Sequence, residues 1–321
     1  MAQAAQPFRI VVTSTEVPLV PNGVIELAAT LGYYAREGVA VEIVRVQQTP
    51  SAIAALASGR GDMANVSVDS ALQLAARGQL ALRAVLSPNK SLPFLIAGSK
   101  AIADVRALGG KSFCVGRVGS LDHSLSTMVL RKHGVEESSV RFVSLGQPNV
   151  RAQALAAGRI DATTMSVGVW LALSDKDRLK VLVDEAAYYA AAPVLNKVNV
   201  IPDAVLRERR DQVAAVTRAI LRASRDFARD PGLWVDAMVK ERPDVPRADL
   251  RQLAASFQGS WSVNGGLHRD EIAFTTDWLF GTPDFAGLKR PAVNDWIEFG
   301  ILDAVLREIG IDPASDPPLH S

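Results

Sequence analysis

The segment Ala55-Leu56-Ala57-Ser58-Gly59-Arg60-Gly61-Asp62 returns later in the chain as Ala154-Leu155-Ala156-Ala157-Gly158-Arg159-Ile160-Asp161. At the same offset, Ser67-Val68 matches Ser166-Val167. Self-similarity at a fixed register indicates an architecture that repeats one supersecondary unit. This stretch therefore predicts two structurally equivalent halves.

The match extends toward the N-terminus of each copy. Gln48 aligns with Gln147, Glu42-Ile43-Val44 with Arg141-Phe142-Val143, Gly38-Val39 with Gly134-Val135 after a three-residue insertion, and Phe8–Val12 with Lys111–Val115. Strand-forming and helix-forming runs alternate, so each copy is predicted to be strand, helix, strand, helix, strand. In the first copy we expect strands at Ile10–Val12 and Val41–Val46, helices at Val24–Arg36 and Ser51–Ala57, and helix stops at Gly38 and Gly59.

Alternating strands and helices predict a parallel sheet in each copy. Such sheets bind small molecules beyond the carboxyl ends of their strands, and two copies supply two such edges. If the lobes face each other, these edges become the two walls of one cleft. We therefore predict an α/β fold with two lobes, each a mainly parallel sheet flanked by helices, and a ligand cleft between the lobes.

Two apolar extended segments connect the copies: Leu92–Ala97 leads into the second copy, and Val194–Ile201 leads out of it. We predict lobe I at residues 8–92 and 199–321, lobe II at residues 93–198, and crossovers near residues 92–97 and 194–201. Helical spacing follows, with helices expected at Val205–Arg229, from Pro231, at Asp270–Phe280 and at Asn294–Ile309. This tail is expected to pack on lobe I.

Composition excludes several classes of protein. With 321 residues, 48% of them hydrophobic, the chain is long enough for two packed lobes. A net charge of +1 gives no one-sided field for nucleic acid or an anionic membrane, so neither is an expected partner. Cys114 is the single cysteine, which excludes an internal disulfide and a cysteine cluster for zinc. No metal or cofactor is expected.

The N-terminal sequence leaves two locations open. No run of roughly 18 apolar residues that could span a bilayer is present, and Met1–Pro7 lacks a basic and apolar signal sequence. Ala2 and Ala4 are similar to the end of a cleavage site, which fits an exported protein whose signal peptide has been removed. A cytosolic protein with a frayed terminus is the alternative.

Several segments share an order and spacing with a known family. These are Leu31-Gly32-Tyr33-Tyr34 with Glu37-Gly38-Val39, Ala55–Asp62, Leu92–Ile96, Gly119-Ser120 after the strand Phe113–Val115, Trp261–Gly266, and Phe299-Gly300-Ile301-Leu302. In these the chain resembles periplasmic substrate-binding proteins of the sulfonate, taurine and nitrate ABC uptake systems, including the thiamine-precursor (NMT1/THI5-like) branch. The resemblance implies a type II periplasmic-binding-protein fold and a monomer that delivers a small molecule to a membrane permease and ATPase. It also implies a periplasmic location, with the signal peptide removed, and no catalytic residues.

The candidate ligand contacts follow from the repeat, in the loops after the predicted strands. They are Ser14, Thr15, Glu16, Gln48, Ser67, Val68 and Asp69 in the first copy, and Arg117, Ser120, His123, Gln147, Ser166 and Trp170 in the second. Several of these loops begin helices, whose backbone N–H groups can receive an anion. The preferred ligand is therefore a small organic anion, a sulfonate or a carboxylate, captured by hinge closure.

Each of these side chains has a structural alternative. Ser120 either caps a helix or donates to an oxyanion, and Arg117 either pairs with an acidic group or is a solvated charge. Glu16 and Asp69 are solvated loop charges or acceptors for an amine or ring N–H. His123 contacts the ligand or packs in the lobe, without metal-ligand spacing to His133. Trp170 is an apolar wall or part of the core.

Two other functions remain open. The first is an enzyme on the same fold, similar to a desulfinase or a pyrimidine-forming enzyme, and the second is a binder of a neutral pyrimidine. Cys114 lies in an apolar strand without a recognisable histidine motif, and no nucleophile elbow, P-loop or zinc-protease motif is present. A transcription regulator is disfavoured because the first strand begins almost at once and leaves no room for a DNA-binding helix-turn-helix.

Overall fold

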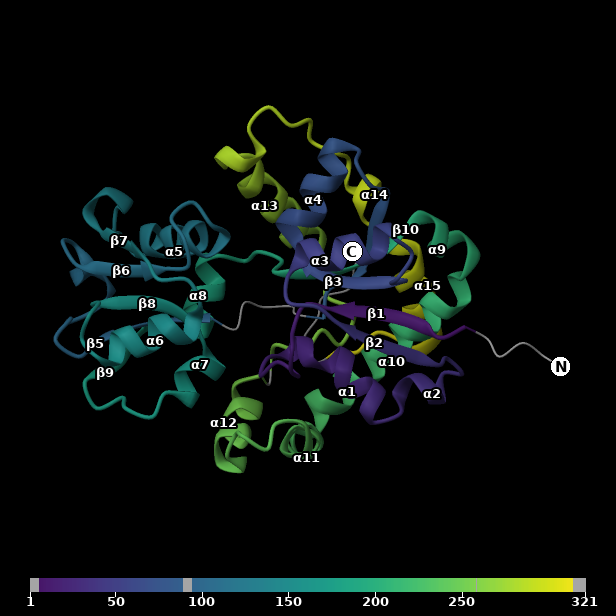
Figure 1. The fold of residues 1–321 in the computed structure, drawn as a ribbon, viewed down its shortest axis with the longest axis horizontal. Coiled ribbons are helices and arrows are strands. Elements are labelled where there is room, and N and C mark those ends of the chain that lie inside the picture. The colour runs from purple at the N-terminus through teal and green to yellow at the C-terminus, as the bar shows by residue number, and fades with distance from the viewer. Residues whose placement is uncertain (1–5, 89–93, 258, 314–321) are drawn as a thin grey trace. The chain divides into compact units, whose positions relative to one another are not determined.

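The computed structural model describes residues 6–88, 94–257 and 259–313. The chain divides into two compact units, labelled by their elements in Figure 1. Unit 1 comprises residues 1–90 and 195–321, and unit 2 comprises residues 91–194. Leu92 and Pro93, which begin the first predicted crossover, lie outside the described residues. Within the described ranges, no helix is both long and apolar enough to cross a membrane.

Unit 1 contains a five-stranded sheet with one antiparallel strand. In sheet order the strands are β2 (Val41–Arg45), β1 (Phe8–Val12), β3 (Met63–Ser67), β10 (Lys197–Pro202) and β4 (Leu82–Leu86). β1 pairs in parallel with β2 and β3, whereas β10 is antiparallel to both β3 and β4. The interior strand β1 is apolar except for Arg9, and its Ile10 and Val11 are fully buried, as expected for a strand that is covered on both faces.

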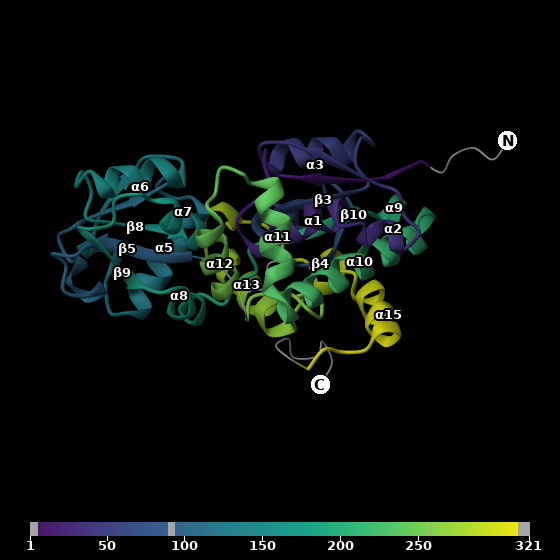
Figure 2. The same cartoon turned by 90° about the horizontal axis from the view of Figure 1, so that it is seen from below.

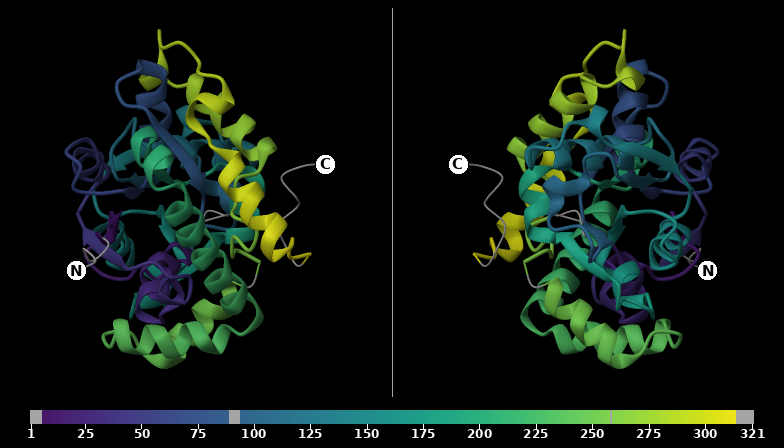
Figure 3. Two further views of the ribbon diagram at one scale, coloured as in Figure 1. Left: turned by 90° about the vertical axis from the view of Figure 1, so that its right-hand side faces the viewer. Right: turned by 90° about the vertical axis from the view of Figure 1, so that its left-hand side faces the viewer.

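Helices cover both faces of this sheet. In Figure 2, α3 (Thr49–Ala57) lies on one side of the strands and α10 (Arg210–Arg229) on the other. The other helical elements are η1 (Pro21–Gly23), α1 (Val24–Thr30), α2 (Tyr33–Arg36), α4 (Val68–Arg77), α9 (Asp203–Glu208), α11 (Pro231–Glu241), α12 (Arg247–Ser256), α13 (Arg269–Phe280), η4 (Pro283–Phe285), α14 (Val293–Trp296) and α15 (Phe299–Ile309). α10 contacts α1, α2 and α15, the yellow helix of Figure 3, so the tail packs on the unit of the first copy as predicted.

Some predicted helix bounds were wrong. The predicted helix Val24–Arg36 is divided into α1 and α2, because Gly32 between them has a left-handed φ of 74°. The predicted helix Val205–Arg229 is divided into α9 and α10 at Arg209, which has a φ of −128°. The predicted helix Asn294–Ile309 is interrupted where the Glu298 N–H donates to the carbonyl of Ala84 in β4. Helix α12 was not predicted.

Unit 2 repeats the same design. In sheet order its strands are β7 (Arg141–Ser144), β6 (Ser112–Val115), β8 (Ala162–Ser166), β5 (Phe94–Ser99) and β9 (Leu179–Val183). Its helical elements are η2 (Val105–Leu108), α5 (Leu121–Lys132), η3 (Glu137–Ser139), α6 (Pro148–Ala156), α7 (Val167–Ala172) and α8 (Glu185–Ala191). β5 is antiparallel to both of its neighbours, and α6 and α8 lie on opposite sides of the sheet in Figure 2.

Strand register confirms the repeat residue by residue. Ile10 pairs with Met63 in unit 1 as Phe113 pairs with Ala162 in unit 2, which is the correspondence that the sequence predicts. The repeated aspartate also has the same partner in both copies. The Arg9 N–H donates to Asp62 Oδ2 at 2.7 Å, and the Ser112 N–H donates to Asp161 Oδ2 at 2.8 Å. The aspartate therefore recurs in both copies because it binds the backbone of the adjacent strand segment in each.

The two segments predicted as crossovers are strands inside the sheets. β5 and β10 each pair with neighbours on both sides, and each has a register shift at its outer pairing, between Ile96 and Ala97 and between Asn199 and Val200. Lys197 and Val198 pair with β3. The predicted lobe boundary between residues 198 and 199 is therefore wrong, because it would divide β10.

Candidate ligand-binding site

The loop after β1 places its predicted residues at the surface of unit 1. Ser14 is half-buried, whereas Thr15 and Glu16 are exposed. Glu16 is 3.5 Å from the Arg242 guanidinium, so its charge already has a partner within the unit. Gln48 is exposed at the start of α3 and makes no side-chain cap bond there. Ser14, Thr15 and Gln48 therefore stay available in this unit.

The junction of β3 and α4 separates three predicted contacts. Ser67 is half-buried, with its Oγ 3.0 Å from Ser70 Oγ. Val68 is fully buried and its N–H donates to the Asn196 carbonyl at 3.0 Å, so neither its side chain nor its amide is accessible. Val68 is therefore removed from the candidate contacts. Asp69 is half-buried, and its Oδ1 has no hydrogen-bond partner among the described residues.

A lysine that the sequence analysis missed lies at this same edge. Lys197 is the first residue of β10, which is antiparallel, so its amino end lies beside the carboxyl end of β3, where it pairs with Ser67. Its Nζ donates to Thr13 Oγ1 at 2.7 Å, directly after β1. Lys197 was missed because an apolar segment between two prolines predicted a connection, and pairing with a distant strand is invisible in local sequence.

Buried asparagines join the strands below this edge. Asn22 Nδ2 donates to Asn65 Oδ1 at 3.0 Å, and Asn65 Nδ2 donates to Asn199 Oδ1 at 2.7 Å. Asn65 and Asn199 are cross-strand partners, two residues from Ser67 and Lys197, so all four side chains share one sheet face. Because buried amides are costly unless bonded, this row fixes η1, β3 and β10 relative to one another.

An ion pair lies close to Lys197. Glu26 of α1 is 3% exposed and binds the Arg45 guanidinium at the end of β2. Burial raises the pKa of Glu26 to about 7, although Arg45 and Lys197 act to lower it. Burial also lowers the pKa of Lys197, and the charge of Glu26 opposes that shift. Two cationic side chains, Arg45 and Lys197, thus act on the Glu26 carboxyl group, and the charge of Glu241 opposes them.

In unit 2, the chain's own carboxylate occupies the start of α5. Asp122 accepts the Gly116 N–H at 3.0 and 3.1 Å on its two oxygens and pairs with Arg151 at 3.0 Å. Ser120 Oγ lies 2.8 Å from Asp122 Oδ1 and 2.6 Å from the Arg117 carbonyl oxygen, and it makes no helix-cap bond. The Ser120 hydroxyl is therefore already engaged, whereas the Arg117 side chain is exposed without a partner among the described residues.

His123 is packed inside unit 2. It is 7% exposed, its Nδ1 accepts the Gly119 N–H at 3.2 Å, and its Nε2 lies 3.7 Å from Glu137 Oε1. Its ring meets Phe142 edge-on with a centroid separation of 4.4 Å. These contacts favour the structural alternative for His123, a residue that orients the loop before α5.

The remaining predicted residues of unit 2 differ in role. Ser166 caps α7, because its Oγ accepts the Val169 N–H at 3.2 Å. Trp170 is half-buried, and Lys176 Nζ lies 5.6 Å from the centre of its ring. Gln147 is exposed at the start of α6, which is the position that Gln48 has at the start of α3. Trp170 and Gln147 thus stay accessible in this unit.

The described residues do not assemble a reactive centre around the cysteine. Cys114 is fully buried in β6, and burial raises the pKa of its thiol. A buried, protonated thiol is a weak nucleophile. Within the ranges that the structure describes, no three His, Cys, Asp or Glu side chains are grouped to hold a metal ion.

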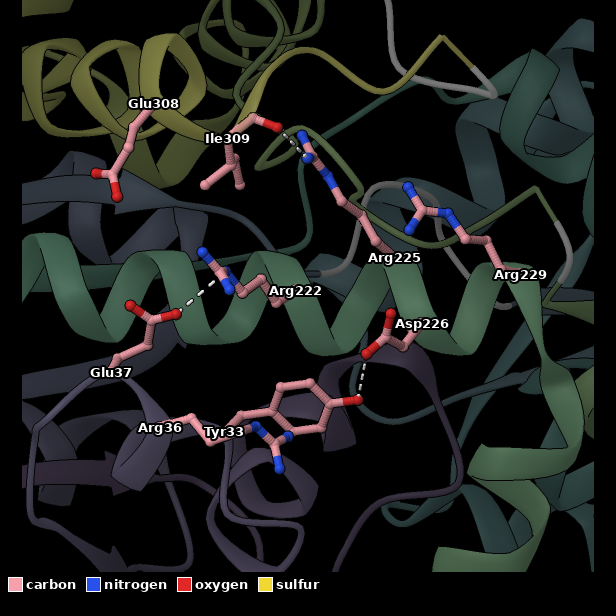
Figure 4. Close-up of a pocket in the computed structure, with 9 residues that line it drawn as sticks. All are labelled: Tyr33, Arg36, Glu37, Arg222, Arg225, Asp226, Arg229, Glu308 and Ile309. Atoms are coloured by element: carbon pink, nitrogen blue, oxygen red, sulfur yellow. Dashed lines mark hydrogen bonds and ion pairs between the residues drawn. The ribbon is translucent and has the colours of Figure 1, made fainter.

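A cavity of about 510 Å³ in unit 1 lies among the helices α2, α10 and α15 (Figure 4). It is lined by Tyr33, Arg36, Glu37, Arg222, Arg225, Asp226, Arg229, Glu308 and Ile309. Two of its carboxylates have partners within the lining: Tyr33 Oη donates to Asp226 Oδ2 at 2.6 Å, and Arg222 lies 3.1 Å from Glu37. These contacts attach α2 to α10, and the contacts of Arg218 with Glu308 and of Arg225 with the Ile309 carbonyl oxygen attach α15 to α10.

Comparison with known proteins places the chain in a family. The profile described as NMT1/THI5 like matches residues 23–232. The chain belongs to the NMT1/THI5-like family. No match is found among curated protein sequences.

Solved structures resemble this NMT1/THI5-like chain over nearly its whole length. The periplasmic sulfonate-binding protein SsuA of Methylobacillus flagellatus is 16% identical, with 98% of each chain covered and a TM-score of 0.77. The periplasmic aliphatic sulphonate-binding protein SsuA of Escherichia coli is 15% identical, with 92% of each chain covered and a TM-score of 0.71. The desulfurization enzyme DSZB is 15% identical, with 94% of this chain and 99% of that chain covered and a TM-score of 0.68. These likenesses confirm the predicted two-lobed type II periplasmic-binding-protein fold.

Proposed function

We propose that this protein is the solute-binding component of an ABC importer and that it captures a small organic anion, a sulfonate or a carboxylate, by hinge closure. The observation that carries the proposal is the duplicated sheet: two units share strand order, register and an antiparallel strand supplied by a connection between the units. Units 1 and 2 would be the two lobes. Each presents polar loops at the carboxyl edge of its sheet, where such sheets bind ligands.

The choice of an anion rests on similarity and on charge. Two of the similar solved proteins are described as sulfonate-binding, and both are periplasmic. Arg117 in unit 2 is exposed without a described partner and is suited to a carboxylate or sulfonate. In this proposal the protein works in the periplasm as a monomer, passes its ligand to a membrane permease and ATPase, and catalyses no reaction.

Closure follows from ligand contacts with both lobes. Hydrogen-bond donors from two edges are satisfied together only when the lobes shut, so the ligand shifts the population toward the closed state. A thermal-shift screen over alkanesulfonates, carboxylates and neutral pyrimidines, followed by calorimetry, tests binding. Small-angle scattering with a saturating hit should then show a decreased radius of gyration. A tight ligand that leaves the radius unchanged would contradict closure.

A desulfurization enzyme is the second candidate, because DSZB has the same fold. Incubation of the protein with each sulfonate hit and with the matching sulfinate, followed by a sulfite assay and mass spectrometry, separates the two functions. Recovery of unchanged ligand supports the binding protein. Sulfite release in proportion to protein concentration would replace the transport proposal with catalysis.

A further inference from the structure

Lys197 is built into the edge of the unit 1 sheet. Its backbone pairs with Ser67 of β3, and its carbonyl oxygen accepts a hydrogen bond from the Ser87 hydroxyl at 2.8 Å. Its Nζ donates a hydrogen bond to Thr13 Oγ1. The Thr13 hydroxyl in turn lies 3.4 Å from the Asn65 carbonyl oxygen. A half-buried ammonium group is thus held in one place, beside the ends of β1 and β3.

Lys197 lacks a full countercharge. The Glu26 carboxyl group near it is already bound to Arg45, and within the described residues Thr13 is the single hydrogen-bond partner of the Lys197 ammonium. An ammonium group has three N–H donors, of which this contact uses one. Glu26 is the carboxyl group whose charge acts on Lys197, and Arg45 shares that charge. An anion that reaches Lys197 would therefore supply both charge and acceptors.

The repeat provides an internal control for this position. Lys197 pairs with Ser67 on β3, and the equivalent pair in unit 2 is Phe94 with Ser166 on β8. Phe94 packs edge-on against Tyr188, with a centroid separation of 5.9 Å. The same fold therefore accepts an aromatic side chain at this register. A lysine there is not required by sheet formation, which favours a role in recognition.

We propose that Lys197 is the residue of unit 1 that binds the acidic group of the ligand, with Thr13 and Ser67 beside it as hydroxyl partners. This inference rests on the proposed function and makes it more specific. The acidic group is a monoanionic sulfonate or carboxylate, because the Lys197 ammonium is the one cation of unit 1 that is proposed to bind it. A neutral ligand would leave that charge uncompensated.

Matched probes test the assignment by calorimetry on the full chain. The anionic probes are butanesulfonate and benzoate, and the neutral probes are butanesulfonamide and benzamide. The variants are Lys197→Met, Lys197→Arg and the control Lys180→Met; Lys180 is a half-buried lysine of β9 whose Nζ donates to the Ala103 carbonyl. Loss of a charge-assisted hydrogen bond should weaken binding of an anionic probe by about tenfold or more in Lys197→Met. Lys197→Arg and Lys180→Met should stay close to wild type.

A second measurement does not depend on the variants' folding. In wild-type protein labelled at lysine, the side-chain NMR signal of Lys197 should shift and saturate as an anionic probe is added, whereas the signal of Lys180 should not. Equal affinities of wild type and a folded Lys197→Met variant would overturn the role of Lys197 and leave the transport proposal standing. If neither anionic probe binds wild type and the Lys197 signal does not move, both the assignment and the organic-anion proposal fail.

Discussion

Replacement of Glu26 by glutamine should change how stability depends on pH. Burial raises the pKa of this carboxyl group from its ordinary 4.5 to about 7, against the opposing charges of Arg45 and Lys197. Between these two values the folded protein holds more protons on Glu26 than the unfolded chain does. The contribution of Glu26 to the free energy of unfolding therefore falls as the pH rises through this window.

The size of the effect follows from the two pKa values. One pKa unit corresponds to about 1.4 kcal/mol, so a change from 4.5 to about 7 predicts an upper limit of about 3 kcal/mol. Glutamine resembles the protonated carboxyl group in shape but does not titrate. The Glu26→Gln variant should therefore gain up to about 3 kcal/mol relative to wild type between about pH 4.5 and about pH 7.5.

Urea unfolding at a series of pH values measures this difference directly. Tryptophan fluorescence is a suitable signal, because Trp234, Trp261 and Trp296 are all buried in unit 1. Glu42→Gln is the control, since Glu42 is exposed on β2, the strand that ends at Arg45. A difference between Glu26→Gln and wild type that stays constant over this range would refute the reasoning, because Glu26 would then be ionised in the folded protein throughout.

Two further predictions separate binding from stability. Trp170→Ala should weaken binding of octanesulfonate by about tenfold and change the affinity for methanesulfonate little, because a half-buried indole contributes apolar contact area rather than charge. Equal losses of affinity for both probes in calorimetry would contradict the role of Trp170 as an apolar wall. Asp161→Ala should lower the free energy of unfolding by about 1–3 kcal/mol, because the Asp161 carboxylate accepts the Ser112 N–H at 2.8 Å and the Ser112 hydroxyl at 2.7 Å. The affinity for butanesulfonate should not change. Those bonds hold the pKa of Asp161 below its usual range, so its contribution in wild type is present above the ordinary pKa of 3.8 and is lost as the pH falls below it. A folded Asp161→Ala variant with unaltered stability but weaker binding would instead place Asp161 in the site.

The repeat allowed the parts of the fold inside it to be predicted. The backbone N–H groups of Arg9 and Ser112 bind the equivalent aspartates. Gly59 and Gly158 both have left-handed φ values, and Gln48 and Gln147 both lie at the start of a helix. These features depend on neighbours within one copy, so the same short pattern produces them twice. The loops after the strands were located for the same reason.

Side-chain roles in those loops were less predictable. Val68 was proposed as a contact from its place next to Ser67, but whether a residue faces the core depends on the helix that begins there. Ser120 was considered as a cap or an oxyanion donor, yet Asp122, two residues later, engages its hydroxyl. Sequence spacing gave the positions of these residues, whereas the competing partners became visible only in three dimensions.

The antiparallel strands explain how two similar edges acquire different chemistry. β5 and β10 lie outside the repeated segments, although each pairs with a repeated strand at the same register. The repeat does not extend to these strands, and their first residues are Lys197 and Phe94. The residues paired with them, Ser67 and Ser166, are both serine. A ligand with one acidic end and one apolar end needs two unlike surfaces. In the proposed mechanism, the strands that connect the lobes therefore supply the difference between the two surfaces, and the repeated strands supply their common shape.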